Sequence, residues 1–128
     1  MWTIIGIVVA LAIMIPVIHD LMSRTKYKHA QAVEAATFAG DAGRLRQLLD
    51  DGGVFTSHDG EGNTPLHFAA MADDPDTEAG CARCAALLIE RGADIHRAND
   101  WGGTPLSIAR RRGHGMVLRV LEEAAGRA

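Results

Sequence analysis

The chain has 128 residues, a formal net charge of −3 and two cysteines. This length leaves room for one small domain and one additional element, which excludes a chain of several large domains. The slightly acidic balance and the absence of a recognisable nucleic-acid-binding motif favour a protein partner over a nucleic acid.

The first predicted element is an apolar helix within residues 1–22. The stretch Trp2–Ile18 contains no charged residue, and Leu21 and Met22 could extend it. Its seventeen residues would span about 26 Å as a helix, close to the ~30 Å hydrocarbon core of a bilayer. A buried helix of a soluble domain would show a polar face, and this segment shows none. We therefore predict a single-pass transmembrane anchor.

A cleaved signal peptide is the alternative interpretation of this apolar segment. It is disfavoured because no basic residue precedes the apolar run. In addition, the pattern of small residues that signal peptidases cleave does not follow it.

A basic juxtamembrane linker, residues 23–29, follows the apolar segment. Arg24, Lys26 and Lys28 lie on this side of it, and no Lys or Arg lies on the other side. Positive residues beside a transmembrane segment favour the cytoplasmic side of the membrane. We therefore predict that the C-terminal domain is cytoplasmic.

The linker is predicted to be helical. Residues 20–38 contain no Pro or Gly, and the Ala-rich residues 30–36 favour helix. We expect the anchor helix to continue through the linker into a helix at about 30–39, either unbroken or with a break near residues 23–25.

Two similar stretches organise the rest of the chain. They run Gly62-Asn63-Thr64-Pro65-Leu66-His67 and Gly103-Thr104-Pro105-Leu106-Ser107. In each, a Thr suited to cap a helix precedes a Pro at the first helical position, where a missing N–H costs nothing. This opening is similar to the Thr-Pro-Leu-His start of an ankyrin repeat. Residues 30–128 therefore resemble the ankyrin-repeat family.

The spacing of glycines between the expected helices supports this resemblance. Gly80 and Gly113 are 33 residues apart, which is the period of ankyrin arrays. Gly40 occupies a similar place before an apolar stripe. The predicted units cover about 30–58, 59–98 and 99–128.

One spacing departs from the period. Thr64 and Thr104 are 40 residues apart, which leaves seven surplus residues. We place them within residues 72–79, an acidic stretch that contains a Pro, as a loop inserted between the two helices of the second unit.

The resemblance implies an all-α fold in which an N-terminal transmembrane helix is followed by a short ankyrin-repeat solenoid. About three helix pairs are expected, joined by hairpin-like loops. The pairs are 30–39 with 43–51, 65–71 with 81–91, and 105–112 with 115–125. The motif residues are then structural: Thr64, Pro65, Leu66, His67, Thr104, Pro105 and Leu106. For His67 the resemblance implies hydrogen bonds to the backbone between neighbouring units.

Cys81 and Cys84 form a CxxC pair with two interpretations. At a helix start, next to Arg83, such thiols could have a lowered pKa and serve redox chemistry. A metal would need two further ligands, and the sequence offers no second pair. Alternatively, the two cysteines continue an apolar stripe with Ala85 and Leu88, in which buried Cys acts as a small hydrophobe. Packing is the favoured interpretation, and we expect no enzyme activity, cofactor or metal.

The resemblance also implies a contact surface on the loop tips and the shorter helices. Carried onto this sequence, the candidate contact residues are Glu61, Asn63, Met71, Asp100, Trp101, Arg111 and Arg112. Trp and Arg are enriched in binding hot spots, although Trp101 could instead fold back on its own hairpin. We expect a protein that holds an unknown partner protein at the membrane surface as an adaptor or inhibitor. A redox or metal-linked role of the CxxC pair is the alternative.

Overall fold

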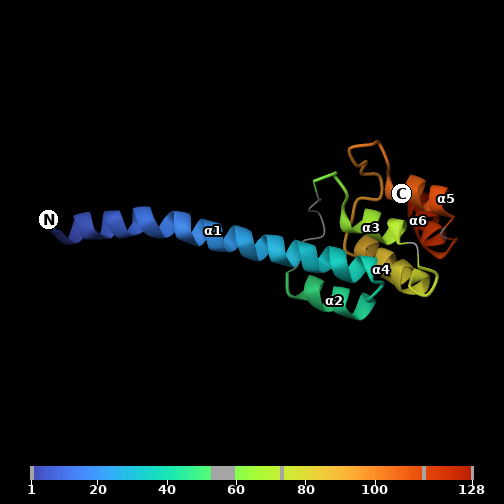
Figure 1. The fold of residues 1–128 in the computed structure, drawn as a ribbon, viewed down its shortest axis with the longest axis horizontal. Helices are drawn as coiled ribbons and strands as arrows, with labels where there is room; N and C mark the ends of the chain where they lie inside the picture. Colours follow the sequence, from blue (N-terminus) through green and yellow to red (C-terminus); the bar gives the residue numbers. More distant parts are fainter. Residues whose placement is uncertain (1, 53–59, 73, 114, 128) are drawn as a thin grey trace.

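The computed structural model describes residues 2–52, 60–72, 74–113 and 115–127 (Figure 1). These residues form helices and connecting turns, with no strand among them, so the predicted all-α class is confirmed for this part of the chain. The helices are α1 (Trp2–Phe38), α2 (Ala42–Asp50), α3 (Pro65–Met71), α4 (Glu78–Glu90), α5 (Pro105–Arg112) and α6 (Gly115–Arg127). The predicted boundary between the first two units, at residues 58 and 59, lies outside the described residues. So does residue 73 of the predicted insertion.

Helix α1 carries both the apolar segment and the first helix of the domain. It runs without interruption through residues 23–25, so the alternative of a break there is wrong, and it contains Pro16. The side chains of residues 3–25 are exposed. By length and composition this helix could cross a membrane. Figure 1 shows its apolar half as a rod that projects from the helical domain.

Three helical hairpins stack side by side in the domain. The C-terminal part of α1 packs on α2, α3 packs on α4, and α5 packs on α6. Helices α1, α3 and α5 contact one another in sequence and form the inner layer. Helices α2, α4 and α6 form the outer layer. Each hairpin therefore contributes one helix to each layer, as the resemblance implies.

Contacts at the helix ends fix the direction of each layer. Cys81, near the start of α4, places its Sγ 3.6 Å from the carbonyl oxygen of Thr37, near the end of α1. Because α4 begins shortly after α3 ends, the C-terminal ends of α1 and α3 lie together. The start of α3 lies beside the start of α5, where His67 Nε2 is 2.9 Å from the Gly103 carbonyl oxygen. The inner helices are thus parallel, and the outer helices run back against them.

The core lies between the two layers and consists mostly of Leu and Ala side chains. Small residues let neighbouring helices approach closely, while the leucines fill the space between the layers. The buried apolar residues are Val33, Ala36, Leu45, Leu48, Leu49, Leu66, Ala69, Ala70, Ala72, Cys81, Cys84, Ala85, Leu87, Leu88, Ile108, Ala109, Val117 and Leu121.

The two motif helices begin where the sequence predicts. Thr64 and Thr104 are the N-caps of α3 and α5, and a Pro occupies the first position of each helix. In α5 the Thr104 N–H donates to Ser107 Oγ (2.9 Å), and the Ser107 N–H donates to Thr104 Oγ1 (3.2 Å). This reciprocal pair satisfies two N–H groups at the start of α5.

Helix α4 begins earlier than the sequence analysis predicts. Residues 72–79 were expected to form a loop, with a helix at 81–91, but α4 starts at Glu78. The Cys81 N–H donates to the Thr77 carbonyl oxygen (2.8 Å), which closes the first turn. An acidic residue at a helix start is stabilised by the helix dipole. Part of the surplus therefore extends α4, so the CxxC pair begins at the end of the first helical turn and not at the first residue of the helix.

Gly40 and Gly80 allow the turn between α1 and α2 to cross α4 at close range. Gly40 and Gly113 have φ of 72° and 73° at turns between helices, as their expected place requires. Gly80 instead lies within α4. A Cβ added to Gly80 would overlap the Gly40 carbonyl group, and one added to Gly40 would lie 2.8 Å from the Thr77 oxygen. Gly80 is therefore needed for space and not for a turn.

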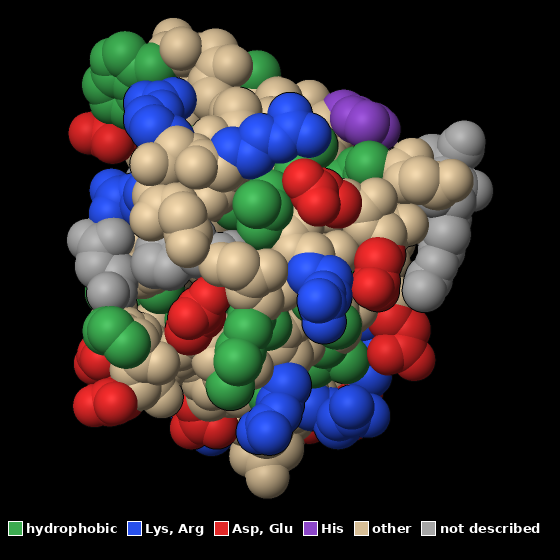
Figure 2. All heavy atoms as spheres, turned by 90° about the vertical axis from the view of Figure 1, so that its right-hand side faces the viewer, with side chains coloured by type: hydrophobic (Ala, Val, Ile, Leu, Met, Phe, Trp, Pro, Cys, Tyr) green, Lys and Arg blue, Asp and Glu red, His purple; other side chains and the backbone are tan. Residues whose placement is uncertain are grey.

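Exposed apolar side chains are concentrated on the projecting half of α1. Among the described residues beyond 25, the large exposed apolar side chains are Phe38, Trp101 and Met116. Figure 2 faces the end of the molecule opposite the projecting helix. It shows Lys and Arg interspersed with Asp and Glu, and hydrophobic side chains in small separate patches. This face of the repeat domain is thus an ordinary water-facing surface, whereas the apolar half of α1 is not.

Candidate functional site

Trp101 lies at the tip of the loop before α5, and Asn99 organises this loop. Asn99 Oδ1 accepts the N–H groups of Trp101 (3.1 Å) and Gly103 (2.8 Å). The Asn99 N–H donates to the Gly103 carbonyl oxygen (2.9 Å). Asn is favoured in turns because its side chain can bond the backbone in this way. The Trp101 side chain is 70 % exposed, so it does not fold back on its own hairpin.

Several of the predicted contact residues line one cavity, which we name the inner pocket. It has a volume of about 260 Å³ and lies between the loop tip and α5. It is lined by Met71, Asn99, Trp101, Gly103, Ile108, Arg111 and Arg112. The fold thus brings together Met71, Trp101, Arg111 and Arg112, which were singled out from separate parts of the sequence.

The inner pocket combines an apolar wall with positive charge. Met71 and Ile108 supply apolar surface, and the exposed Arg111 lies beside them. Arg110 is directed elsewhere, since its Nη2 lies 3.8 Å from Glu122 Oε1. Such a pocket suits an apolar side chain accompanied by an acidic group, because Arg binds carboxylates and packs against apolar surface.

Asn63 is a correction to the predicted contact residues. Its side chain is only 4 % exposed, and its Oδ1 accepts a hydrogen bond from Asn99 Nδ2 (2.9 Å). Asn63 therefore joins neighbouring loops rather than facing a partner. Its place in a loop motif gave no indication that the next loop would cover it.

Glu61 and Asp100 lie on the loop edge outside the inner pocket. The Asp100 N–H donates to the Glu61 carbonyl oxygen (3.0 Å), which joins the two loops through their backbones. Both side chains are exposed. They remain candidate contact residues at the margin of the site.

His67 connects the second unit to the third. It is fully buried, and its Nδ1 accepts the Thr64 N–H (3.0 Å). A nitrogen that accepts this bond carries no proton, so the proton is on Nε2, which lies 2.9 Å from the Gly103 carbonyl oxygen and donates to it. His67 therefore bonds the backbone of its own helix start and of the next loop, which is the role that the resemblance implies.

The CxxC pair is buried in the centre of the domain. Cys81 and Cys84 are free thiols at 1 % and 0 % exposure. Burial raises the pKa of Cys81, and it raises the pKa of Cys84 to about 12, with the neighbouring Cys81 and Asp41 adding to the effect. Because the thiolate is the reactive form, this environment favours packing over redox chemistry. Among the described residues, no three His, Cys, Asp or Glu side chains gather as metal ligands.

Asn99 and Ile108 are pocket residues that the sequence analysis missed. Asn99 lies in the run Asn99-Asp100-Trp101-Gly102-Gly103, whose composition is typical of a turn. That signal could have identified Asn99 as the residue that shapes the tip. Ile108 shows no such signal, because it reads as an ordinary core position.

Comparisons with known proteins agree with the fold. Residues 31–126 match a family described as ankyrin repeats, in three copies. The chain is similar to potassium channel GORK of Arabidopsis thaliana (34 % identity over 84 residues, 66 % of this chain). It is also similar to potassium channel KOR2 of Oryza sativa subsp. japonica (38 % over 80 residues, 62 % of this chain). A third relative is inversin of Mus musculus (30 % over 93 residues, 72 % of this chain).

These relatives are much longer than the chain. The matched segments cover 9 % of GORK, 10 % of KOR2 and 8 % of inversin. The similarity therefore concerns a module that the longer proteins also contain, and it does not extend to their other parts.

Proposed function

The chain belongs to the ankyrin-repeat family, and on that premise we propose that it is a single-pass membrane protein whose repeats hold a partner protein at the membrane. It acts as an adaptor or inhibitor and carries out no catalysis. The observation that carries this proposal is the continuous helix α1, whose first half is apolar and exposed and whose second half is part of the repeat domain.

The exposure of α1 supports the membrane anchor. A core helix of a soluble protein would be buried inside the fold, whereas the side chains of residues 3–25 are exposed. Exposed apolar surface of this extent is unfavourable in water. A bilayer would cover it, and the similarity to proteins named as potassium channels is compatible with a setting at a membrane.

The basic residues after the apolar segment support a cytoplasmic repeat domain. Arg24 and Lys28 are exposed on α1. Arg24 Nε lies 2.9 Å from Asp20 Oδ2, but acidic residues contribute little to the orientation of membrane segments. The positive charge after the span therefore favours the cytoplasm for everything that follows it.

We expect a reporter that is active only in the cytoplasm to be active when fused after Ala128. A reporter active only outside should be inactive at the same position. Changing Arg24, Lys26 and Lys28 together to Gln should reduce the cytoplasmic signal, because the positive charge that keeps this end of the helix in the cytoplasm is lost. N-terminal sequencing of the mature chain provides the control. Loss of residues 1–22 would identify a signal peptide and contradict the anchor.

Ankyrin repeats imply protein–protein interaction, and we assign the contact to the inner pocket. The double variant Trp101→Ala/Arg111→Ala is expected to weaken capture of membrane-fraction partners by tenfold or more, because hot-spot residues contribute about 2 kcal/mol each. Quantitative pull-down with the detergent-solubilised full chain measures this. Met116→Ala/Arg119→Ala removes the same kinds of side chain from α6 and should change nothing. Equal capture by both double variants would show that the inner pocket is not the contact.

A further inference from the structure

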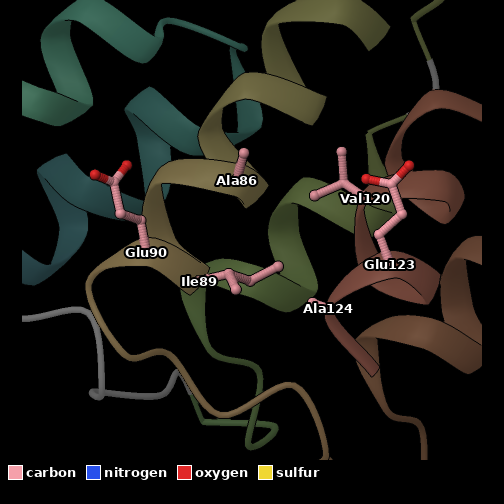
Figure 3. Close-up of a pocket in the computed structure, with 6 residues that line it drawn as sticks. All are labelled: Ala86, Ile89, Glu90, Val120, Glu123 and Ala124. Atoms are coloured by element: carbon pink, nitrogen blue, oxygen red, sulfur yellow. The ribbon is translucent and has the colours of Figure 1, made fainter. Parts of the chain in front are cut away.

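A second cavity lies on the opposite side of the domain, between the outer helices α4 and α6. We name it the outer groove. Its volume is about 390 Å³, and four apolar side chains form most of its lining: Ala86, Ile89, Val120 and Ala124. Figure 3 shows Ile89 and Val120 on facing helices, with Ala86 on the same helix as Ile89.

Two carboxylates border this apolar strip. Glu90 on α4 and Glu123 on α6 lie on opposite sides of the groove (Figure 3). Both side chains are exposed, and neither has an ion-pair partner among the described residues. No Lys or Arg is among the groove's lining residues; Arg46 and Arg83 line the adjoining cavity on the other side of Ala86 and Glu90. A complementary ligand therefore has a central apolar stripe with a positive charge on each side.

The outer groove lies toward the projecting half of α1. Helices α4 and α6 run antiparallel to the inner layer. The start of α4 meets the end of α1 through Cys81 and Thr37, and the start of α6 meets the start of α4, where the Met116 N–H donates to Glu78 Oε1 (3.0 Å). Their C-terminal ends, which carry Glu90 and Glu123, therefore point in the direction of the apolar segment. Figure 1 shows α4 running back toward the N-terminal side of the domain.

The unbroken helix limits how far the domain can be from the membrane. From Met22, at the end of the apolar segment, to Val33, the first fully buried residue among the described side chains of α1, the helix spans eleven residues. A helix of this length measures about 16 Å. With no loop in between, the domain that carries the groove is held close to the segments that directly follow neighbouring transmembrane helices.

We infer that the outer groove binds the basic, amphipathic juxtamembrane segment of another membrane protein. This inference rests on the proposed membrane anchor. On the cytoplasmic side, such segments are enriched in Lys and Arg. The positive charge that the groove's carboxylates require in a ligand is therefore present in the segments that lie next to the bilayer. Apolar residues of the segment pack on Ile89 and Val120, and its flanking Lys or Arg residues pair with Glu90 and Glu123.

The test measures fluorescence anisotropy of a labelled helical peptide with the full chain in neutral-detergent micelles. The peptide carries Leu at positions i, i+3, i+4 and i+7, with Lys and Arg on both flanks. Glu90→Lys/Glu123→Lys should weaken binding at least tenfold, because attraction becomes repulsion. The control Asp51→Lys/Asp76→Lys makes the same charge change on exposed residues outside the groove and should stay within twofold. Partition of the peptide into micelles is equal for all variants, so it does not affect the comparison.

A second variant tests the apolar strip without changing any charge. Ala86→Trp introduces a large ring into the groove from an exposed position on α4. This variant should also weaken binding of the peptide tenfold. Equal binding of the peptide by the wild-type chain and Glu90→Lys/Glu123→Lys would overturn the inference. This holds even if Ala86→Trp weakens binding, because the two carboxylates would then play no part. Self-association of the full chain in nanodiscs that Glu90→Lys/Glu123→Lys abolishes would assign the groove to a second copy and overturn it as well.

These outcomes are separable from those of the proposed function. The peptide assay does not depend on topology, and the reporter fusions do not depend on the groove. If the cytoplasmic reporter is active but peptide binding does not depend on the groove, this inference is wrong and the membrane anchor stands. Groove-dependent binding with a reporter active only outside overturns the assignment to cytoplasmic juxtamembrane segments.

Discussion

Replacing Gly80 with alanine is expected to destabilise the repeat domain by about 3 kcal/mol, at the upper end of the range for overpacked positions. The added Cβ would overlap the Gly40 carbonyl group and lie 3.0 Å from the Gly40 Cα. These are backbone atoms, so no side-chain rotation can relieve the overlap. The turn between α1 and α2 would have to move away from α4, which would open the core around Cys81.

The two cysteines provide the measurement. They are the only thiols in the chain, and both are buried in α4, so their labelling reports on the repeats and not on the apolar half of α1. Their raised pKa values further slow labelling of the folded state. The wild-type thiols should label only after urea unfolding, and Gly80→Ala should label at markedly lower urea concentration.

Gly43 supplies the matched control for this substitution. It also lies in a helix, but the nearest atom to its added Cβ is Asp41 Oδ1 at 3.7 Å, an ordinary contact. Gly43→Ala should therefore leave stability unchanged or raise it slightly, because alanine favours helix over glycine. If Gly80→Ala unfolds at the same urea concentration as Gly43→Ala, the crossing at Gly40 is looser than described.

The parts of the fold that follow from local chemistry could be predicted from the sequence. Thr64 and Thr104 identify helix starts because a side-chain cap followed by proline is favourable only there. The continuation of α1 into the domain follows from the absence of Pro and Gly in residues 20–38. In each case the residues that decide the structure are neighbours in the chain.

The parts that depend on distant contacts could not be predicted. The early start of α4 reflects turn bonds at residues 74–77 within a stretch whose composition suggests a loop. Asn63 looks like an exposed loop residue until the loop of Asn99 covers it. Gly80 reads as a turn glycine, and only the approach of Gly40 shows why no side chain fits there.

The two candidate sites also differ in how far the sequence identifies them. The resemblance to a family pointed to the inner pocket, because residues such as Trp101 and Arg111 occupy its expected contact positions. No sequence motif marks the outer groove. Its walls come from α4 and α6, and Glu90 and Glu123 lie one 33-residue period apart in the sequence, so the stacking of neighbouring units brings them to one strip.

Replacing His67 with alanine is the second change expected to have a large effect, at about 3 kcal/mol of lost stability. The fully buried ring bonds the Thr64 N–H and the Gly103 carbonyl oxygen. Removing it leaves the Thr64 N–H without this partner, and an unsatisfied buried group costs about 1–3 kcal/mol. The Gly103 carbonyl oxygen keeps the bond from the Asn99 N–H but loses the bond that joins the two units. The cavity left by the ring adds to this cost.

Ser107 makes it possible to separate the two bonds. It occupies the equivalent position in the third unit, where its hydrogen bonds among the described residues all go to Thr104 of its own helix start. Ser107→Ala should therefore cost about 1 kcal/mol, the usual value of a lost cap. The excess loss in His67→Ala then contains the bond between units together with the cavity that the larger ring leaves.

The position of the loss distinguishes coupling between units from a merely local defect. In a solenoid, stability depends on contacts between neighbouring repeats, so a chain without the His67 bond to Gly103 should release α5 and α6 before α3 and α4. Hydrogen exchange of the detergent-solubilised full chain should show faster exchange in α5 and α6 of His67→Ala, while Cys84 in α4 remains protected from labelling. Uniform loss of protection in all four helices would mean that the domain unfolds as one unit and that His67 does not set a boundary within it.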